Sequence, residues 1–435
     1  MEYTKKIEVA YDVDVCVAGG GPAGVAAAVS AARQGVKVLL IESQGFFGGA
    51  GTAGLVPAFM PFENGVDFLA DGIGREIYEA SRQDPSVIMD RTVGIQLERL
   101  KKIYDDLVVE AGVEFLFFSQ VIDVIKKGRN IEALIVSTKS GLLAVKAKVF
   151  IDTTGDADVC ALSGVAYTLG DEKGNTMPAS LCSLWADIEW EKMWMPHTAF
   201  LEEAFKDHVF TQEDRHIPGF CRAGKTSGGA NIGHVFNVDA TNVQDLTQAM
   251  IKGRKILREF ETYFTKYVKE GYENAFPMVS ASYLGVRESR RIQGEYVMTI
   301  EDFMNRASFE DEIGRFSYPV DIHIANPSKD AYDAFVKEHS SLRYADGESY
   351  GIPYRALLPK ELDNLLVAGR CISADRQMLS SVRVMPACFI TGQAVGVAAA
   401  LSIDKGWQVK EIDIKELQRR LKAIGAFLPN FTEEG

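Results

Sequence analysis

The chain has 435 residues, of which 47% are hydrophobic and 25% are charged, and its formal net charge is −13. This composition is ordinary for a folded globular protein, and the length favours two domains over one. The acidic balance, without any run of Lys and Arg, argues against nucleic acid and anionic membranes as partners.

The start of the chain is charged and has no apolar core, so we expect no signal peptide. The best candidate for a membrane span, 387–401, is short and contains Gly and Gln, so we expect none. The six cysteines are dispersed without a CxxC pair, which predicts no redox disulfide, iron–sulfur cluster or structural metal site. Together these features predict a cytoplasmic protein.

The strongest motif lies in the first fifty residues. An apolar stretch, 13–18, is predicted to be a buried strand, and it leads into a glycine-rich turn, 19–24. A helix of small residues, 25–34, follows, and then a second strand, 36–41, which ends at Glu42. Strand, glycine turn, helix, strand and acidic residue in this order indicate a dinucleotide-binding βαβ unit.

Each position of the turn has a physical task in such a unit. Gly19 permits the tight turn, Gly21 lets backbone N–H groups approach a pyrophosphate, and Gly24 lets the helix pack closely on the strand. The helix N-terminus adds partial positive charge for the phosphates. Glu42 can accept hydrogen bonds from ribose hydroxyls.

Further elements follow the turn. We predict a helix over 93–111 and strands over 115–118, 121–125, 131–137 and 142–150. A turn at 139–141 joins the last two strands. The run 149–152 is predicted to be a strand that leads into a Gly-Asp turn. At 365–370 the residue pattern is again typical of a nucleotide-binding domain, with an apolar strand that ends in Gly-Arg. The helix that begins near Pro386 carries Gly392 and Gly396 on one face, which predicts close packing on the N-terminal helix.

The middle of the chain differs from both ends. Trp, Tyr, Phe and all six His concentrate there, and its elements are less regular. We therefore predict a nucleotide-binding domain from 1–166 and 354–435, the latter with a tail helix, interrupted by an inserted α+β substrate domain at 167–353. The fold class is α/β, a Rossmann domain with an inserted domain.

The ordered landmarks resemble the bacterial FAD-dependent oxidoreductases with the glutathione-reductase-like fold. The landmarks are 14–42, 47–52, 150–158, 283–291, 351–355, 364–373 and 382–386. The resemblance covers nearly the whole chain and implies non-covalently bound FAD as the cofactor. No CxxC lies beside the expected flavin, so disulfide-reductase chemistry is not implied.

The resemblance also implies the residues that hold FAD. The ADP half would be held by Gly19, Gly21, Gly24 and Glu42, with Pro22, Ala23 and Ser43 beside them. The pyrophosphate and ribityl would lie along Gly48, Gly49 and Thr52, and the adenine would contact Val121. The nucleotide would be covered by Gly155 and Asp156, and the ribityl or pyrophosphate would contact Gly369 and Arg370. Arg383 and Met385 belong to the same site, because the helix near Pro386 would point its positive end at the flavin.

Four residues are candidates for the chemistry. His234, after a Gly-Gly turn, is a possible base. Arg287 could hold a carboxylate. At least one of the three arginines 287, 290 and 291 is expected to be structural, because adjacent residues cannot lie on the same face of a helix or strand. The alternation at 320–323 predicts a strand that places Asp321 beside His323 as a second possible base. Tyr354 lies near the predicted domain junction, where ligand sites are common.

Three functions remain open at this stage. The leading hypothesis is an FAD-dependent dehydrogenase or reductase that moves a hydride between a small polar organic molecule and the flavin N5. The second resembles fumarate reductase, in which an Arg acts as the acid on a C=C bond. The third is an electron-transfer subunit of a larger complex, similar to heterodisulfide-reductase flavoproteins. We expect a small-molecule substrate and a possible homo-oligomer.

Overall fold

The computed structural model describes residues 4–432, except 85–87, 90, 194–196, 216, 326–327, 331–332, 334–336 and 338–341. Its largest sheet has the order β6-β2-β1-β9-β8-β7, and β20 also pairs with β9. The strands are β1 Glu8–Ala18, β2 Val38–Ile41, β6 Glu114–Leu116, β7 Gln120–Lys127, β8 Asn130–Thr138, β9 Gly141–Asp152 and β20 Leu365–Val367.

Strand β9 joins two parts of this sheet. Its first residues pair antiparallel with β8, which pairs with β7, to form a meander. Its later residues pair in parallel with β1 on one side and with β20 on the other, and β2 and β6 extend the parallel part. The predicted α/β fold with a Rossmann-like parallel core is therefore confirmed, and so are the meander strands at 121–150.

The apolar runs explain why the parallel strands form. Successive side chains of a strand point to opposite faces, yet Val15, Cys16 and Val17 of β1 are all fully buried. Both faces of the sheet are therefore covered, which is typical of parallel sheets and requires continuous apolar runs rather than alternation.

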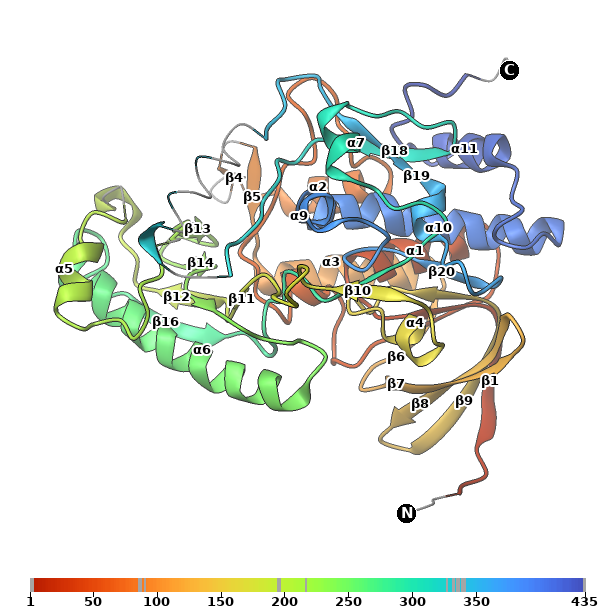
Figure 1. Ribbon diagram of the computed structural model, residues 1–435, viewed down its shortest axis with the longest axis horizontal. Coiled ribbons are helices and arrows are strands. Elements are labelled where there is room, and N and C mark those ends of the chain that lie inside the picture. Colours follow the sequence, from red (N-terminus) through yellow and green to blue (C-terminus); the bar gives the residue numbers. More distant parts are fainter. Residues whose placement is uncertain are drawn as a thin grey trace.

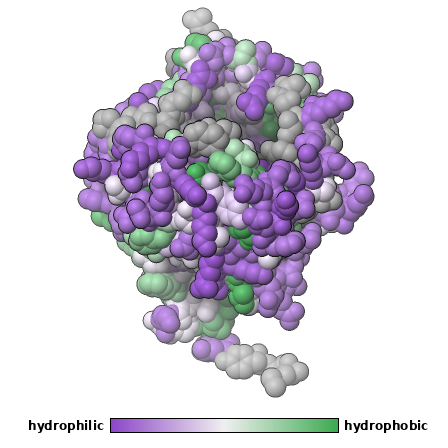
Figure 2. All heavy atoms as spheres, turned by 90° about the vertical axis from the view of Figure 1, so that its left-hand side faces the viewer, coloured by the Kyte–Doolittle hydropathy of each residue, from purple (hydrophilic) through white to green (hydrophobic). Residues whose placement is uncertain are grey.

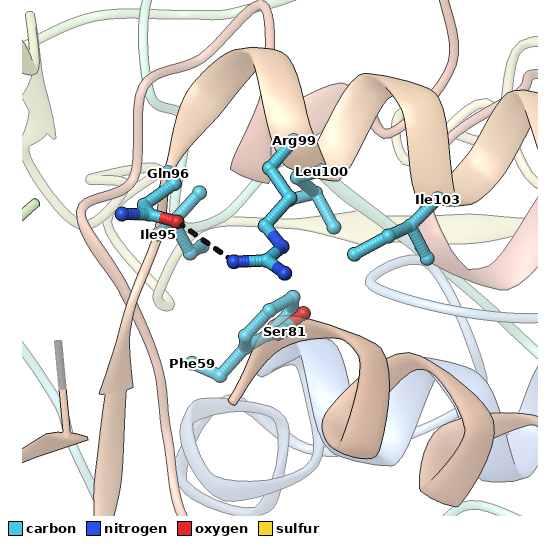
Figure 3. A pocket seen from close by; sticks show the side chains of 7 residues that line it. All are labelled: Phe59, Ser81, Ile95, Gln96, Arg99, Leu100 and Ile103. Carbon is cyan, nitrogen blue, oxygen red and sulfur yellow. Dashed lines mark hydrogen bonds between the residues drawn. The ribbon is translucent and has the colours of Figure 1, made fainter. Parts of the chain in front are cut away.

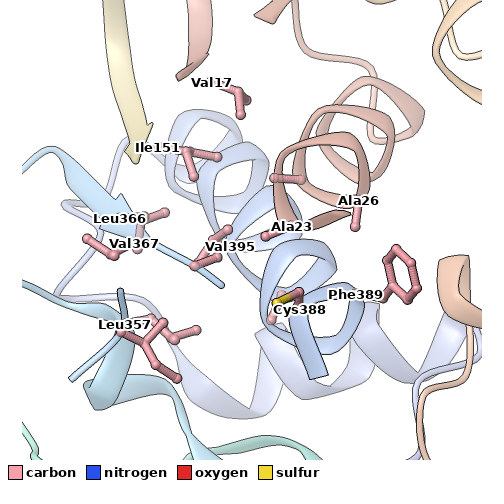
Figure 4. Close-up of a cluster of buried hydrophobic side chains, with 14 of the residues drawn as sticks. Val17, Ala23, Ala26, Ile151, Leu357, Leu366, Val367, Cys388, Phe389 and Val395 are labelled. Atoms are coloured by element: carbon pink, nitrogen blue, oxygen red, sulfur yellow. The ribbon is translucent and has the colours of Figure 1, made fainter. Parts of the chain in front are cut away.

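Helix α1 (Pro22–Arg33) follows β1 and packs on α10 (Met385–Lys405), as Figures 1 and 4 show. Two glycines of α10 permit this contact. A Cβ on Gly392 would lie 2.2 Å from the Ala23 carbonyl oxygen, and a Cβ on Gly396 would lie 2.2 Å from that of Ala27. The predicted close packing of the two helices is confirmed, and it is a contact of backbone against backbone.

Helix α10 is longer than its apolar stretch. It has 21 residues, and by length and composition it is the one helix among the described residues that could cross a membrane. However, 94% of its most apolar window is buried inside the protein. The apolar stretch 387–401 is short, but the helix continues to Lys405, so burial rather than length identifies it as a core helix.

The buried side chains of this sheet and its helices form one large cluster, which we call the first core. The elements outside the second cluster that have not yet been named follow. They are η1 Gly49–Gly51, β3 Ala58–Phe59, α2 Ile73–Ser81, β4 Ile88–Met89, β5 Thr92–Gly94, α3 Leu97–Glu110, α4 Asp158–Leu162, β10 Tyr167–Leu169, β17 Arg290–Ile292, α7 Ile300–Met304, β18 Glu312–Phe316, β19 Tyr350–Pro353, η5 Tyr354–Leu357, α9 Arg376–Val382 and α11 Ile414–Ala423. The helix predicted from residue 93 begins only at Leu97, because Val93 belongs to β5, which pairs with β3.

Buried side chains between 179 and 284 form a second cluster. The elements that carry it lie at the left of Figure 1. Its elements are β11 Ala179–Ser180, β12 Ser183–Ala186, η3 Trp190–Lys192, α5 Leu201–Lys206, β13 Phe220–Arg222, β14 Gly228–Ala230, β15 His234–Val235, α6 Val243–Tyr263, η4 Phe264–Val268 and β16 Phe276–Ser280. The outer face of this end is mostly hydrophilic, with apolar side chains scattered among polar ones (Figure 2).

The buried residues of the predicted insert, 167–353, are divided between the two clusters. Apart from Leu55, the second cluster consists of residues between 179 and 284. Ile292, Phe303, Phe316 and Ile352 belong instead to the first cluster. The domain boundaries at 166/167 and 353/354 stay a prediction, but the later part of the predicted insert packs on the nucleotide core.

The α1–α10 contact generates the first prediction. We expect Gly396→Ala to lower the free energy of unfolding by about 3 kcal/mol, because the added methyl group meets a backbone carbonyl that cannot move alone. The matched control is Gly74→Ala in α2, where the nearest atom would be 3.4 Å from the new Cβ. Denaturant unfolding should show no loss for the control; equal stability of the two variants would contradict the account.

A buried histidine of the second cluster should make the stability of the protein depend on pH. His197 is 3% exposed, its Nε2 lies 2.9 Å from the Tyr272 hydroxyl, and burial lowers its pKa to about 4. The unfolded chain takes up this proton near pH 6.5, so stability is complete above pH 6.5 and falls as the pH drops towards 4. The histidine should cost about 2 kcal/mol of stability between pH 7.5 and 5.0.

His197→Phe should lack that share of the pH dependence, although it is less stable overall because the Tyr272 hydroxyl loses its partner. Denaturant unfolding at both pH values measures it, with the exposed His208→Asn as the control. An unchanged pH dependence in His197→Phe would show that this imidazole is not held neutral.

Candidate functional site

The glycine turn after β1 is tight. Gly19 has φ +100°, and a Cβ there would lie 2.6 Å from the Thr153 carbonyl oxygen. A Cβ on Gly24 would lie 1.8 Å from the Gly19 carbonyl oxygen. The turn and the helix therefore exclude any side chain at these two positions, for the reasons that the sequence analysis gave.

Gly21 differs from its neighbours because its environment is open. A Cβ there would meet only the Cα of Gly49, 4.0 Å away. Gly21 is the N-cap residue of α1 and caps it with no side chain, and Pro22 takes the first helical position. The second glycine loop lies against this turn, because the Gly48 N–H donates to the Gly20 carbonyl at 2.8 Å.

Glu42 lies beside the same turn and is 7% exposed. Its Oε2 accepts from the Gly20 N–H at 2.7 Å, and its Oε1 accepts from the Gln44 N–H at 2.7 Å and from the Ser43 hydroxyl at 3.1 Å. The Ser119 N–H donates to the Glu42 carbonyl, which brings the start of β7, with Val121, towards this carboxylate. The predicted acidic residue is thus fixed at the mouth of the turn.

A polar clasp joins three segments beyond β9. Arg370 Nη2 donates to Asp156 Oδ1 at 2.8 Å, the Ser289 hydroxyl donates to the same oxygen at 2.6 Å, and Arg370 Nη1 donates to that hydroxyl at 2.9 Å. A Cβ on Gly155 would lie 3.0 Å from Arg370 Nη2, and one on Gly369 would lie 3.1 Å from the Ala23 Cβ. These four predicted residues therefore meet near the first turn of α1.

The remaining predicted cofactor residues point in different directions. The Thr52 hydroxyl donates to the Phe47 carbonyl at 2.7 Å and closes its own loop. Met385 begins α10, and its Sδ lies 3.1 Å from where a Gly51 Cβ would be. Arg383 turns away from that loop, because its Nη2 donates to the carbonyl and carboxylate of Asp321 at 3.1 and 3.3 Å.

These residues fit a dinucleotide with a negatively charged centre. Helices α1 and α10 both begin without a side-chain cap, and the glycine positions leave backbone N–H groups near the first. Uncapped helix N-termini attract phosphate and other anions. The space around Gly21, the buried Glu42 and the Arg370 clasp could hold the pyrophosphate and ribose of FAD, and α10 could hold its flavin.

A second buried polar group, which we call the histidine pair, lies between the two cores. His234 Nε2 is 2.8 Å from His323 Nδ1, and both side chains are buried. Asp214 lies 3.1 Å from His234 Nδ1 and accepts from the His234 N–H at 2.8 Å. Asp321 lies 3.5 Å from His323 Nε2 and also binds Arg383. The two histidine candidates from different segments therefore meet.

The electrostatics favour neutral imidazoles in this pair. Burial lowers the pKa of His234 and outweighs Asp214, which raises it. Burial and then Arg287 lower the pKa of His323 well below its ordinary value. Burial would raise the pKa of Asp321, but His323 and Arg383 hold this pKa well below its ordinary value.

Arg287 belongs to the same buried group, and its neighbouring arginines do not. It donates from Nη1 to the Pro178 carbonyl and the Ser180 hydroxyl, both at 2.9 Å, and from Nη2 to Asn231 Oδ1 at 3.0 Å. Arg290 pairs with Asp158 at 2.9 Å, and Arg291 pairs with Glu288. Arg290 and Arg291 are structural, which agrees with the argument from adjacency.

Two expectations are corrected. Tyr354 is 2% exposed and its hydroxyl donates to the Val409 carbonyl at 2.8 Å, so it packs inside the first core and does not join the histidine pair. The segment 320–323 forms no strand. Asp321 and His323 still meet, because the Asp321 N–H donates to the Ser380 hydroxyl at 3.0 Å and fixes the extended segment on α9.

Asp214 and Asn231 are site residues that the sequence alone does not identify. Asp214 sits in a charged stretch that reads as an exposed loop, and nothing in the local sequence shows that His234 folds back on it. Asn231 was visible only as the third residue before His234. Both are recognised from tertiary contacts alone.

Among the described residues, no group of three or more His, Cys, Asp or Glu side chains could hold a metal ion. A small hollow between α2 and α3 is lined by Phe59, Ser81, Ile95, Gln96, Arg99, Leu100 and Ile103 (Figure 3). Its lining is largely apolar, and its one charged group, Arg99, donates to Gln96 at 3.3 Å. This hollow has no acid or base for chemistry.

A protein-family model described as FAD dependent oxidoreductase matches residues 14–421. The chain belongs to this family. It is therefore an enzyme, and its cofactor is FAD.

Curated relatives share only part of their length with this chain. Thiamine thiazole synthase of Methanococcus aeolicus is 30% identical over 187 residues, 40% of this chain and 66% of that protein. Mitochondrial dihydrolipoyl dehydrogenase of Schizosaccharomyces pombe is 30% identical over 181 residues, 39% of this chain and 33% of that protein. The chain thus spans less than two thirds of either relative, and the two differ in chemistry.

Among solved structures, a geranylgeranyl bacteriochlorophyll reductase-like protein from Thermoplasma acidophilum is similar over 98% of this chain and 94% of its own, with 13% identity and a TM-score of 0.46. This is a distant likeness, and it does not indicate a substrate.

The open position of Gly21 generates a prediction about the cofactor. Its backbone, with φ −70° and ψ −173°, accepts any residue. Gly21→Ala should therefore fold with unchanged apoprotein stability, while its methyl group occupies the space of the pyrophosphate and raises the Kd for FAD by about tenfold or more. Titration of apoprotein with FAD, followed by flavin fluorescence, measures this; wild-type affinity would place the pyrophosphate elsewhere.

Proposed function

We propose that this enzyme is a dehydrogenase that removes a hydride and a proton from a small polar organic molecule such as a hydroxy compound. The observation that carries the proposal is the histidine pair, a buried base between the second core and the N-terminus of α10. The link is short: Arg383, two residues before Met385, binds Asp321, which lies beside His323.

The hydrogen-bond network suggests which atom takes the proton. Two neutral imidazoles carry two ring hydrogens for three contacts, those of Asp214 with His234, of His234 with His323 and of His323 with Asp321. In one of the two possible arrangements, His234 Nδ1 carries a hydrogen and donates it to Asp214. His234 Nε2 is then an acceptor, so the hydrogen between the rings belongs to His323 Nδ1. In this arrangement His323 Nε2 carries a lone pair, and it is the atom that we propose accepts a proton from a substrate hydroxyl.

The resulting imidazolium would be stabilised by groups already in place. Asp321 lies 3.5 Å from His323 Nε2 and would form an ion pair with it. Asp214 fixes the tautomer of His234, as a carboxylate does in other histidine bases. FAD, when bound, accepts the hydride, so the substrate loses two electrons and one further proton and becomes a carbonyl compound.

A second function has one specific observation in its favour. Burial and the nearby Arg383 lower the pKa of Arg287 to about 10, which makes it a better proton donor than an exposed arginine. This is what a fumarate-reductase-like enzyme with an arginine acid needs. It predicts that an enoate oxidises the reduced enzyme, and that Arg287→Lys stops this oxidation with FAD still bound.

Asparagine variants test the dehydrogenase. His323→Asn lacks Nε2, and His234→Asn keeps a group near Asp214 but lacks the Nε2 that orients His323. We expect the rate of flavin reduction by substrate to fall about 100-fold or more in both. Anaerobic stopped-flow absorbance measures this rate, and the exposed His208→Asn is the matched control. Wild-type rates in both variants would remove the base from the proposal.

The lowered pKa values also predict the pH dependence. Because the pKa of both histidines is lowered, the pair is neutral and able to accept a proton throughout the range above pH 6.5. The rate of flavin reduction should be constant from pH 7 to 8.5 and should decrease only below about pH 6. An acid limb centred above pH 7 would contradict a buried, neutral pair.

A further inference from the structure

Arg287 is an exception among the buried arginines of this protein. It is 6% exposed, and its partners, a carbonyl, a hydroxyl and an amide oxygen, are all neutral. Among the described residues, no carboxylate oxygen lies within the 4.0 Å of an ion pair from its guanidinium. By contrast Arg291 pairs with Glu288, and Arg315 pairs with Glu312 at 2.9 Å.

A buried charge without an opposite charge in contact is costly, so most proteins pair it. The neutral acceptors of Arg287 instead fix the direction of its guanidinium and leave its charge uncompensated at contact distance. Removal of the partner of a buried charge usually destabilises a protein. An arginine kept in this state is therefore typical of a site where a ligand supplies the negative charge.

A second positive group faces the same place. Arg383 is largely buried, and its Nε has no hydrogen-bond partner among the residues that the structure describes, although its Nη2 binds Asp321. The two guanidinium groups lie near enough for Arg383 to lower the pKa of Arg287. Arg383 also comes directly before the uncapped N-terminus of α10, which adds partial positive charge.

Three side chains at the edge of this region are partly accessible to solvent. The Asp321 side chain is 34% exposed, and Asn231 and Tyr318 are half-buried. A small molecule could therefore reach the two arginines from the side of Asp321 and Asn231, next to His323.

We propose that Arg287, assisted by Arg383, is an anion subsite that binds a carboxylate group of the substrate. The inference rests on the proposed function, and it narrows the substrate class to small hydroxy carboxylates. A carboxylate fits because a planar guanidinium binds its two oxygens together. The carbon that carries the hydroxyl would then lie next to the carboxylate, between Arg287 and His323 Nε2.

The test uses the FAD-loaded enzyme and two probes of the same size, malonate and its neutral diamide malonamide. The holoenzyme is titrated at constant ionic strength, and the change in flavin absorbance gives the Kd. Malonate should produce a saturable change, and malonamide should produce none at the same concentrations. Equal responses to both probes would overturn the subsite.

Variants assign the binding to Arg287. Arg287→Gln should raise the Kd for malonate by about tenfold or more, because a charge-assisted pair is lost. Arg287→Lys keeps the charge but not the planar fork, so its Kd should lie between the two. The control is Arg254→Gln on the exposed face of α6, which should bind malonate as the wild type does. Melting temperature and FAD content exclude misfolding, and an unchanged Kd in folded Arg287→Gln would overturn the proposal.

The two proposals fail in different ways. If malonate binding depends on Arg287 but His323→Asn reduces its flavin at the wild-type rate, the subsite stands and the base is wrong. If His323→Asn abolishes reduction but malonate binds Arg287→Gln as it binds the wild type, the base stands and the carboxylate subsite is overturned.

Discussion

The structure depends on one contact, that of helix α1 with helix α10. At Gly392 and Gly396 the backbone of α10 lies against the carbonyls of Ala23 and Ala27, a distance that excludes even a methyl group. Gly392 lies seven residues from Met385, so the N-terminus of α10 extends about 10 Å beyond the crossing at the start of α1. Two uncapped helix N-termini are thus held at a fixed separation, and both favour negative charge. One elongated cofactor with a phosphate centre and an electron-accepting ring matches that arrangement.

The second core contributes side chains and backbone groups to the region near the N-terminus of α10. Its strand β15 supplies His234, and the segment before β12 supplies the carbonyl and hydroxyl that orient Arg287. The segment 320–323, which packs on α9, supplies the other histidine. None of these segments has a site by itself. A base, its orienting carboxylates and a buried cation arise only where the two cores meet, which is also where a reactive cofactor ring would need them.

Local patterns were sufficient to predict the nucleotide-binding half. The apolar run of β1, the glycines at 19 and 24 and the small-residue face of α10 each have one structural explanation, and the structure has all of them. The histidine pair was predicted only as two separate candidates, because the contact joins residues 89 positions apart. Asp214 gave no signal, since an acidic residue in a charged loop is usually exposed. Tyr354 was predicted to bind a ligand because it lies near a predicted domain junction. It is instead structural, because the hydroxyl of a buried tyrosine often needs only a carbonyl partner.

The most direct test is a crystal structure of the enzyme with FAD bound. We expect the pyrophosphate to lie on the N-terminus of α1 beside Gly21 and a ribose hydroxyl to bind Glu42. The flavin ring should end at the N-terminus of α10, with His323 and Arg287 on its open face. A flavin ring on the far side of α10 from the histidine pair would contradict the proposed function, because neither histidine could then reach a substrate held against the flavin.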